Sequence, residues 1–148
     1  MLRIAFAFIV AVLVASAAAA VIQTQFNLAA LADLAVPIDG ATRWAATQHD
    51  LLHFTPTMAM MMAATLAVAL PIAYALYRRR LQRAWFALAG LVGLMAAFQL
   101  IDYLAPMPTL LAVNRELLGW ALMCLCGGLA GQLFVTLGLP AAQEQNPC

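Results

Sequence analysis

This 148-residue chain contains two histidines, and their spacing of four residues is suited to binding a metal ion. His49 and His53 share one face if their segment is helical, because residues at positions i and i+4 lie one turn apart. Two imidazoles on one helix face can supply two ligands to zinc or copper. The chain has no third histidine, so a complete metal site also needs a carboxylate, a methionine or a cysteine from elsewhere.

The segment from His49 to His53 resembles the HExxH motif of zinc proteases in the spacing of its histidines. Asp50 stands where that motif has glutamate, and its shorter side chain does not place a general base at the same point. The structural alternative is a pair of interfacial histidines whose polar tips reach water. A metal or redox site at His49 and His53 therefore stays an alternative function, and we expect no enzymatic activity.

Sulfur-containing side chains form two further groups. Thioethers select Cu(I), but methionines that follow one another on a helix point around it and serve as flexible core filler. Cys124 and Cys126 point about 200° apart on a helix, so they cannot form a disulfide with each other. Neither group requires a cofactor, and the cofactor is unknown from the sequence. The methionines are Met58, Met60, Met61 and Met62.

Asp102 and Gln99 are the polar residues nearest the membrane interior in the third apolar segment. An acid within a membrane segment suggests a proton or cation site. Asp102 lies at the predicted outer end of its segment, where it can also reach water or pair with Arg43 or Arg115. A small transporter, or a lipid- or quinone-binding protein that uses Asp102 and Gln99, is the second alternative.

The predicted topology brings several ionisable residues to one membrane level. If the histidines converge on a carboxylate there, the group could bind a divalent metal or relay protons. If the imidazoles point to the headgroups instead, the group is only a solvated rim. This candidate outer-rim polar site comprises His49, Asp50, His53, Asp102, Arg115 and Glu116.

Four apolar segments must position these residues. The chain is 66% hydrophobic and 9% charged, whereas soluble domains carry about 25% charged residues. The segments cover about residues 4–22, 54–77, 84–101 and 117–139, each near the roughly 20 residues that cross a bilayer core. Lipid offers the backbone no hydrogen-bond partners, so the segments should be helices. We predict an all-α integral membrane protein, a single four-helix bundle domain over residues 1–148.

The first apolar segment also has features of a signal peptide. Arg3 precedes an apolar run that ends in small residues from Ser16 to Ala20. The run is longer than the usual apolar region of a signal peptide, so we expect the segment to be retained as a transmembrane helix.

The arginines predict the orientation. The short loop between the second and third segments is the densest positive cluster, and such loops stay in the cytoplasm. Both termini then lie on the cytoplasmic side of a bacterial inner membrane. The net charge of +1 argues against nucleic acid as a partner. The cluster comprises Arg78, Arg79, Arg80 and Arg83.

Residues 23–53 form the one sizeable segment outside the membrane. Pro37, Asp39 and Gly40 predict a turn that divides it in two. We expect short amphipathic helices over residues 26–36 and 41–54 that lie along the membrane surface, with Trp44 at headgroup depth. Thr55 is then the predicted N-cap of the second transmembrane helix, followed by a proline in the first turn.

Glycines on the third and fourth segments predict close helix contacts, because small residues let backbones approach in lipid. The contacts serve either packing within the bundle or a dimer face. These glycines are Gly90, Gly93, Gly127 and Gly131.

The sequence contains no phosphate-binding loop and no nucleophile elbow. The leading hypothesis is a non-enzymatic accessory subunit, or an oligomer-forming subunit, of a membrane complex. Its expected partners are the lipid bilayer and other membrane subunits or further copies of itself, with the amphipathic outer segment as the contact surface.

Overall fold

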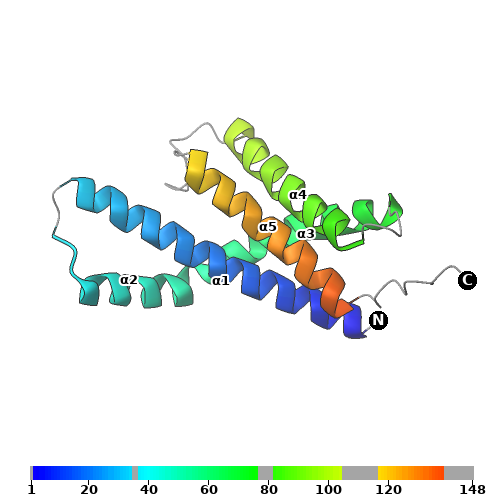
Figure 1. The fold of residues 1–148 in the computed structure, drawn as a ribbon, viewed down its shortest axis with the longest axis horizontal. Helices are drawn as coiled ribbons and strands as arrows, with labels where there is room; N and C mark the ends of the chain where they lie inside the picture. Colours follow the sequence, from blue (N-terminus) through cyan, green and yellow to red (C-terminus); the bar gives the residue numbers. More distant parts are fainter. Residues whose placement is uncertain (1, 35–36, 77–81, 105–116, 139–148) are drawn as a thin grey trace, which may run out of the picture.

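The computed structural model describes residues 2–34, 37–76, 82–104 and 117–138, and these ranges contain helices and no strand (Figure 1). Four of the helices are long and apolar enough to cross a membrane. The prediction of an all-α chain with four long apolar helices is confirmed. The five helices are α1 (Leu2–Asp33), α2 (Gly40–His53), α3 (Thr55–Ala75), α4 (Gln82–Leu104) and α5 (Leu117–Gly138).

The four long helices form a ring in which α1 contacts α5, α5 contacts α4, α4 contacts α3, and α3 contacts α1. Two hydrogen bonds align one end of this ring. Arg3 Nε donates to the carbonyl oxygen of Leu137 at 2.9 Å, and Trp85 Nε1 donates to that of Ala73 at 3.1 Å. We call this the arginine end, because it carries Arg3 and Arg83. The opposite end carries α2 and is called the hairpin end.

Small residues on α1 allow close packing inside the ring. Ala7, Ala11, Ala15 and Ala19 recur every four residues and are completely buried. Residues with this spacing share a helix face, so a partner backbone can approach along the whole row. Larger side chains fill the centre of the bundle, where the fully buried ones include Phe86, Phe98, Met62, Leu66, Leu94 and Met123.

Helix α1 is longer than expected. It continues without a break from Leu2 to Asp33, so the separate helix expected over residues 26–36 is instead an extension of the first one. The residues after Ile22 are mostly good helix formers, and the first proline is Pro37. At about 1.5 Å per residue α1 is about 48 Å long, which exceeds the roughly 30 Å of a bilayer core.

The side chain of Asp39 caps the N-terminus of helix α2. The Asp39 carboxylate accepts a hydrogen bond from the backbone N–H of Thr42 at 2.8 Å. This bond satisfies an N–H that has no partner inside the helix. Hydrogen bonding from the Thr42 side chain, and then from its backbone N–H, lowers the pKa of Asp39.

Helices α2 and α3 meet at Phe54 with little interruption. The N–H of Phe54 donates to Asp50 O at 2.8 Å, and its carbonyl accepts from Met58 N at 3.0 Å. The predicted N-cap at Thr55 is wrong, because Phe54 holds that position and the helix start has no side-chain cap bond. The expected proline in the first turn of α3 is confirmed.

Candidate functional site

Helix α2 runs back along the last third of α1, and the two form a helical hairpin at one end of the molecule (Figure 1). Polar side chains join them. Thr24 Oγ1 donates to Asp50 Oδ2 at 2.8 Å, and Gln25 Nε2 donates to Thr47 Oγ1 at 3.1 Å. Arg43 Nη1 donates to Gln25 Oε1 at 2.7 Å. We call these five residues the hairpin contact.

The hairpin contact uses one side of α2. Arg43, Thr47 and Asp50 are four and then three residues apart, so they lie on one helix face. Trp44 and Leu52 lie about 100° and 180° around the helix from Arg43, and their side chains are 66% and 72% exposed. Leu51, 41% exposed, lies beside them. We call Trp44, Leu51 and Leu52 the apolar face of α2.

This arrangement reverses the usual one for a surface helix, which turns its apolar stripe to the core. Here α2 turns polar groups inward, where α1 supplies hydrogen-bond partners, and leaves large apolar groups outside. An exposed apolar patch of this kind is typical of a surface that another molecule or a membrane covers.

The two histidines lie on the flank between these sides. Their rings stack with centroids 4.2 Å apart and planes inclined by 17°, and both residues are exposed. His53 Nδ1 lies 2.9 Å from the carbonyl oxygen of His49 and donates to it, because a carbonyl oxygen can only accept. Asp50 lies between them in sequence, but its carboxylate faces Thr24 on α1.

The other predicted members of the outer-rim site are more scattered. Asp102 and Gln99 are exposed near the end of α4, and neither forms a hydrogen bond or ion pair with another described residue. Arg115 and Glu116 lie outside the described residues. Within the described ranges no three histidine, cysteine or acidic side chains are close enough together to hold a metal ion. A metal site at His49 and His53 stays a prediction.

Cysteines and methionines do not converge on a site either. Cys124 and Cys126 are both buried and free on α5. Met58 and Met62 are buried in the bundle core, whereas Met60 points away from it and is exposed. The buried sulfur atoms therefore serve packing, in line with the flexible filling role of methionine.

The predicted packing glycines of α5 lie against α4. A methyl group at Gly90 would overlap the carbonyl oxygen of Gly127, and one at Gly131 would overlap that of Phe86. Gly93 faces the other neighbour, since a methyl group there would lie 2.9 Å from the β-carbon of Ala69 on α3. These glycines therefore meet helices of the same chain.

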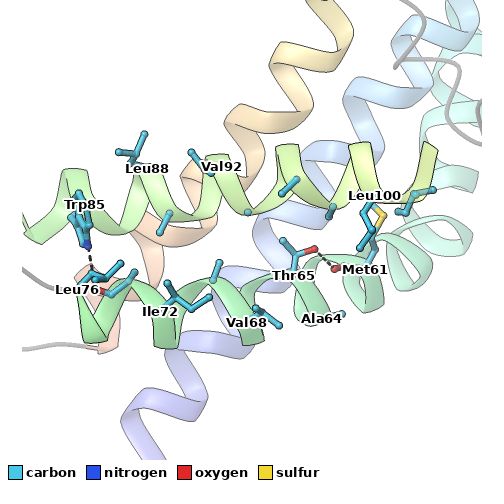
Figure 2. Close-up of a pocket in the computed structure, with 17 residues that line it drawn as sticks. Met61, Ala64, Thr65, Val68, Ile72, Leu76, Trp85, Leu88, Val92 and Leu100 are labelled. Carbon is cyan, nitrogen blue, oxygen red and sulfur yellow. Dashed lines mark hydrogen bonds between the residues drawn. The ribbon is translucent and has the colours of Figure 1, made fainter. Parts of the chain in front are cut away.

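An apolar groove of about 670 Å³ lies between α3 and α4 (Figure 2). Its floor contains small residues such as Ala69, Ala89 and Gly93, and large exposed side chains such as Ile72 and Leu88 form its rims. We call it the α3–α4 groove. Its complete lining is Met61, Ala64, Thr65, Val68, Ala69, Ile72, Ala73, Leu76, Trp85, Leu88, Ala89, Val92, Gly93, Ala96, Ala97, Leu100 and Ile101.

Sequence reasoning missed both the groove and the hairpin contact. The signal for the contact was the polar pair Thr24–Gln25, which follows an apolar run and stays in the same helix. A third missed feature is a pair of buried oxygens on α1. Ser16 Oγ and Gln23 Oε1 have no hydrogen-bond partner among the described residues. No sequence pattern distinguishes such buried polar groups from exposed ones.

Protein-family models, curated proteins and solved structures were all compared with this chain, and none of them matches it.

Proposed function

We propose that this chain is a non-enzymatic, multi-pass protein of the bacterial inner membrane, an accessory or oligomer-forming subunit. It contacts another membrane subunit, or a second copy of itself, through the apolar face of α2. The observation that carries this proposal is the reversed orientation of α2, with its polar side against α1 and Trp44 and Leu52 exposed.

The hairpin contact holds α2 in this orientation. Turning the apolar face toward α1 would break three side-chain hydrogen bonds between the two helices. Each such bond contributes about 0.5–1.5 kcal/mol, and more where a charged group takes part. The apolar face is therefore a stable feature of the surface, available to a partner without rearrangement.

A partner protein covers this face better than lipid does. Trp44 and Leu52 are eight residues apart, which places them about 12 Å apart along the helix. The headgroup layer on one side of a bilayer is only about 5–7 Å thick. Because α2 runs back along α1, which spans the bilayer in this proposal, the face extends beyond that layer.

The charges support an orientation with the arginine end in the cytoplasm. Among the described residues, the arginine end carries Arg3 and Arg83 and no acidic side chain. Excess arginine marks the cytoplasmic side of membrane proteins. The described acidic residues all belong to the hairpin end, and they are Asp33, Asp39, Asp50 and Asp102.

Mutation of the apolar face tests the partner proposal. We expect the double variant Trp44→Ser/Leu52→Ser to lower the mass of the complex isolated in mild detergent, measured by light scattering and native mass spectrometry. The matched control is His49→Ser/His53→Ser, which changes two exposed residues on the flank of the same helix. An unchanged mass in the apolar-face variant, with an intact fold, contradicts the proposal.

Cysteine labelling tests the orientation. In a background with Cys148→Ser, Ala41→Cys on α2 should react with a membrane-impermeant maleimide in intact cells. Ala84→Cys at the start of α4 should react only after the cells are opened. Reaction of Ala84→Cys in intact cells would invert the proposed topology.

A further inference from the structure

We propose that the α3–α4 groove binds one acyl chain of an anionic phospholipid, with the headgroup at the arginine end. The inference depends on insertion of the bundle in a membrane, but not on the partner proposed for α2. The groove lies between two helices that are each long and apolar enough to span a bilayer, so hydrocarbon is the medium that fills it.

The shape of the groove suits an extended hydrocarbon chain. Its lining runs from Met61 to Leu76 on α3 and from Trp85 to Ile101 on α4, a length of about 23 Å. Small residues such as Ala69, Ala89 and Gly93 line its floor, so methylene groups can lie along it at contact distances of about 4 Å.

The chemistry of the lining selects the apolar part of a lipid. The hydroxyl of Thr65 donates to the carbonyl oxygen of Met61 at 2.9 Å, and the indole N–H of Trp85 donates to that of Ala73 (Figure 2). The two polar side chains of the lining therefore have partners within the protein. A quinone ring or a sterol hydroxyl would find no free side-chain donor there, and a buried polar group without a partner is costly.

The position of the charges selects the headgroup. Figure 2 shows Trp85 and Leu76 at one end of the groove, which is the arginine end, and Met61 and Leu100 at the other. Arg83 lies in the first turn of α4, about 160° around the helix from Trp85, is exposed, and has no partner among the described residues. A phosphate at the mouth of the groove would lie at the same level along α4 as this arginine, whereas the described acids lie at the hairpin end.

The depth of one leaflet defines how far the acyl chain reaches into the groove. Half of a bilayer core is about 15 Å, which corresponds to about ten residues of helix rise. An acyl chain that enters the groove beside Trp85 therefore passes the floor residues Ala89 and Gly93. This places Trp85 against the upper part of the acyl chain and makes its indole a natural reporter.

Fluorescence quenching tests the proposal. The protein carries Trp44→Phe and Trp120→Phe, so that Trp85 is the sole tryptophan, and is reconstituted into phosphatidylcholine vesicles. Brominated-chain phosphatidylglycerol or brominated-chain phosphatidylcholine is then added at matched mole fractions. We expect the phosphatidylglycerol to reach half-maximal quenching of Trp85 at an about fivefold lower mole fraction, the effect of one arginine near an anionic headgroup. Arg83→Gln should remove this preference.

A groove-filling variant separates binding in the groove from general contact with lipid. Ala89→Leu should weaken the quenching by phosphatidylglycerol, whereas Ala75→Leu, an exposed alanine of α3 outside the lining, should not. If Ala89→Leu does not fold, Ala96→Leu replaces it at an exposed lining position. Equal quenching by the two lipids, or equal behaviour of the groove and control variants, overturns the proposal. Absence of quenching by both lipids, with Trp85 protected in a dimer, also overturns it.

Discussion

Helix α4 contacts its two neighbours in opposite ways, although small residues line both contacts. Toward α5, Gly90 lies against Gly127, and Gly131 lies against the backbone of Phe86. Toward α3, Gly93 meets the side chains of Ala69 and Thr65, and a groove of about 670 Å³ opens around them. One side of the helix is closed by backbone contact, and the other side is open.

The difference follows from which atoms meet. On the α5 side, Gly90 and Gly127 face each other, and Gly131 meets the backbone of Phe86, so the backbones themselves are in contact. On the α3 side, Gly93 meets side-chain atoms of Ala69 and Thr65, and these keep the backbones apart. A small-residue pattern therefore does not predict by itself which neighbouring helix packs closely.

The largest expected effect comes from blocking the closed side. Gly131→Leu should prevent α4 and α5 from packing, because even a β-carbon at this position overlaps backbone atoms of Phe86 and Ala87. Overpacking costs about 1–3 kcal/mol where side chains can move, and a rigid backbone makes the loss larger. The measurement is thermal unfolding in detergent. Gly131→Ala against Gly128→Ala is the matched pair, since a methyl at Gly128 makes only ordinary contacts. Equal stability of the two alanine variants would show that the closed contact is absent.

The same substitution on the open side should cost less. A methyl group in Gly93→Ala lies 2.9 Å from Ala69 Cβ and 3.3 Å from Thr65 Cγ2, and these are side-chain atoms on a helix beside an open groove. We expect a loss of about 1 kcal/mol, at the lower limit for overpacking. Unfolding in a detergent titration measures it. A loss as large as that of Gly131→Ala would mean that the two sides of α4 are equally tight.

An effect of similar size, but confined to one end of α3, is expected at the bond that joins α3 and α4 at the arginine end. Trp85→Phe keeps an aromatic ring but removes the donor to the carbonyl oxygen of Ala73 in the last turn of α3. The loss should be about 0.5–1.5 kcal/mol, the usual contribution of one hydrogen bond. Faster hydrogen exchange confined to the end of α3 would confirm it. An exchange pattern identical to that of the unmodified protein would show that the bond does not hold α3 in place.

The smallest expected effect is at the N-terminus of α2, which does not contact α4. Hydrogen bonding from the Thr42 side chain, and then from its backbone N–H, lowers the pKa of Asp39 below its ordinary value of 3.8. A lowered folded-state pKa contributes stability above about pH 4, and that stability is lost as the pH falls through the folded-state pKa. The start of α2 should therefore fray in acid, as measured by hydrogen exchange at Thr42 and Arg43. Asp39→Asn, which caps without titrating, should remove the pH dependence at this site.

Part of the candidate site was predictable because helix periodicity alone specifies it. The spacing of Arg43, Asp50 and Trp44 placed polar and apolar groups on different sides of α2. The structure adds that the polar side faces α1. Periodicity identifies the faces of a helix but does not identify the partner of each face.

The sequence by itself determined the class of the molecule. Apolar runs close to the thickness of a bilayer, and the rarity of charge, specify long apolar helices because an unpaired backbone in lipid is too costly. The cap at Asp39 and the proline after Thr55 are also local, since they depend on hydrogen bonds within one turn.

Only the tertiary structure decided how far α1 continues, which neighbour each glycine meets, and where a groove stays open. Residues that extend a helix past Ile22 are the same residues that would form a separate short helix, so tertiary contacts with α2 are needed to distinguish the two. The groove opens between α3 and α4, which the Trp85–Ala73 bond joins at the arginine end, because residues such as Ala69, Ala89 and Gly93 are too small to fill the space between them. Such a balance between distant contacts has no signature in the order of residues along one helix.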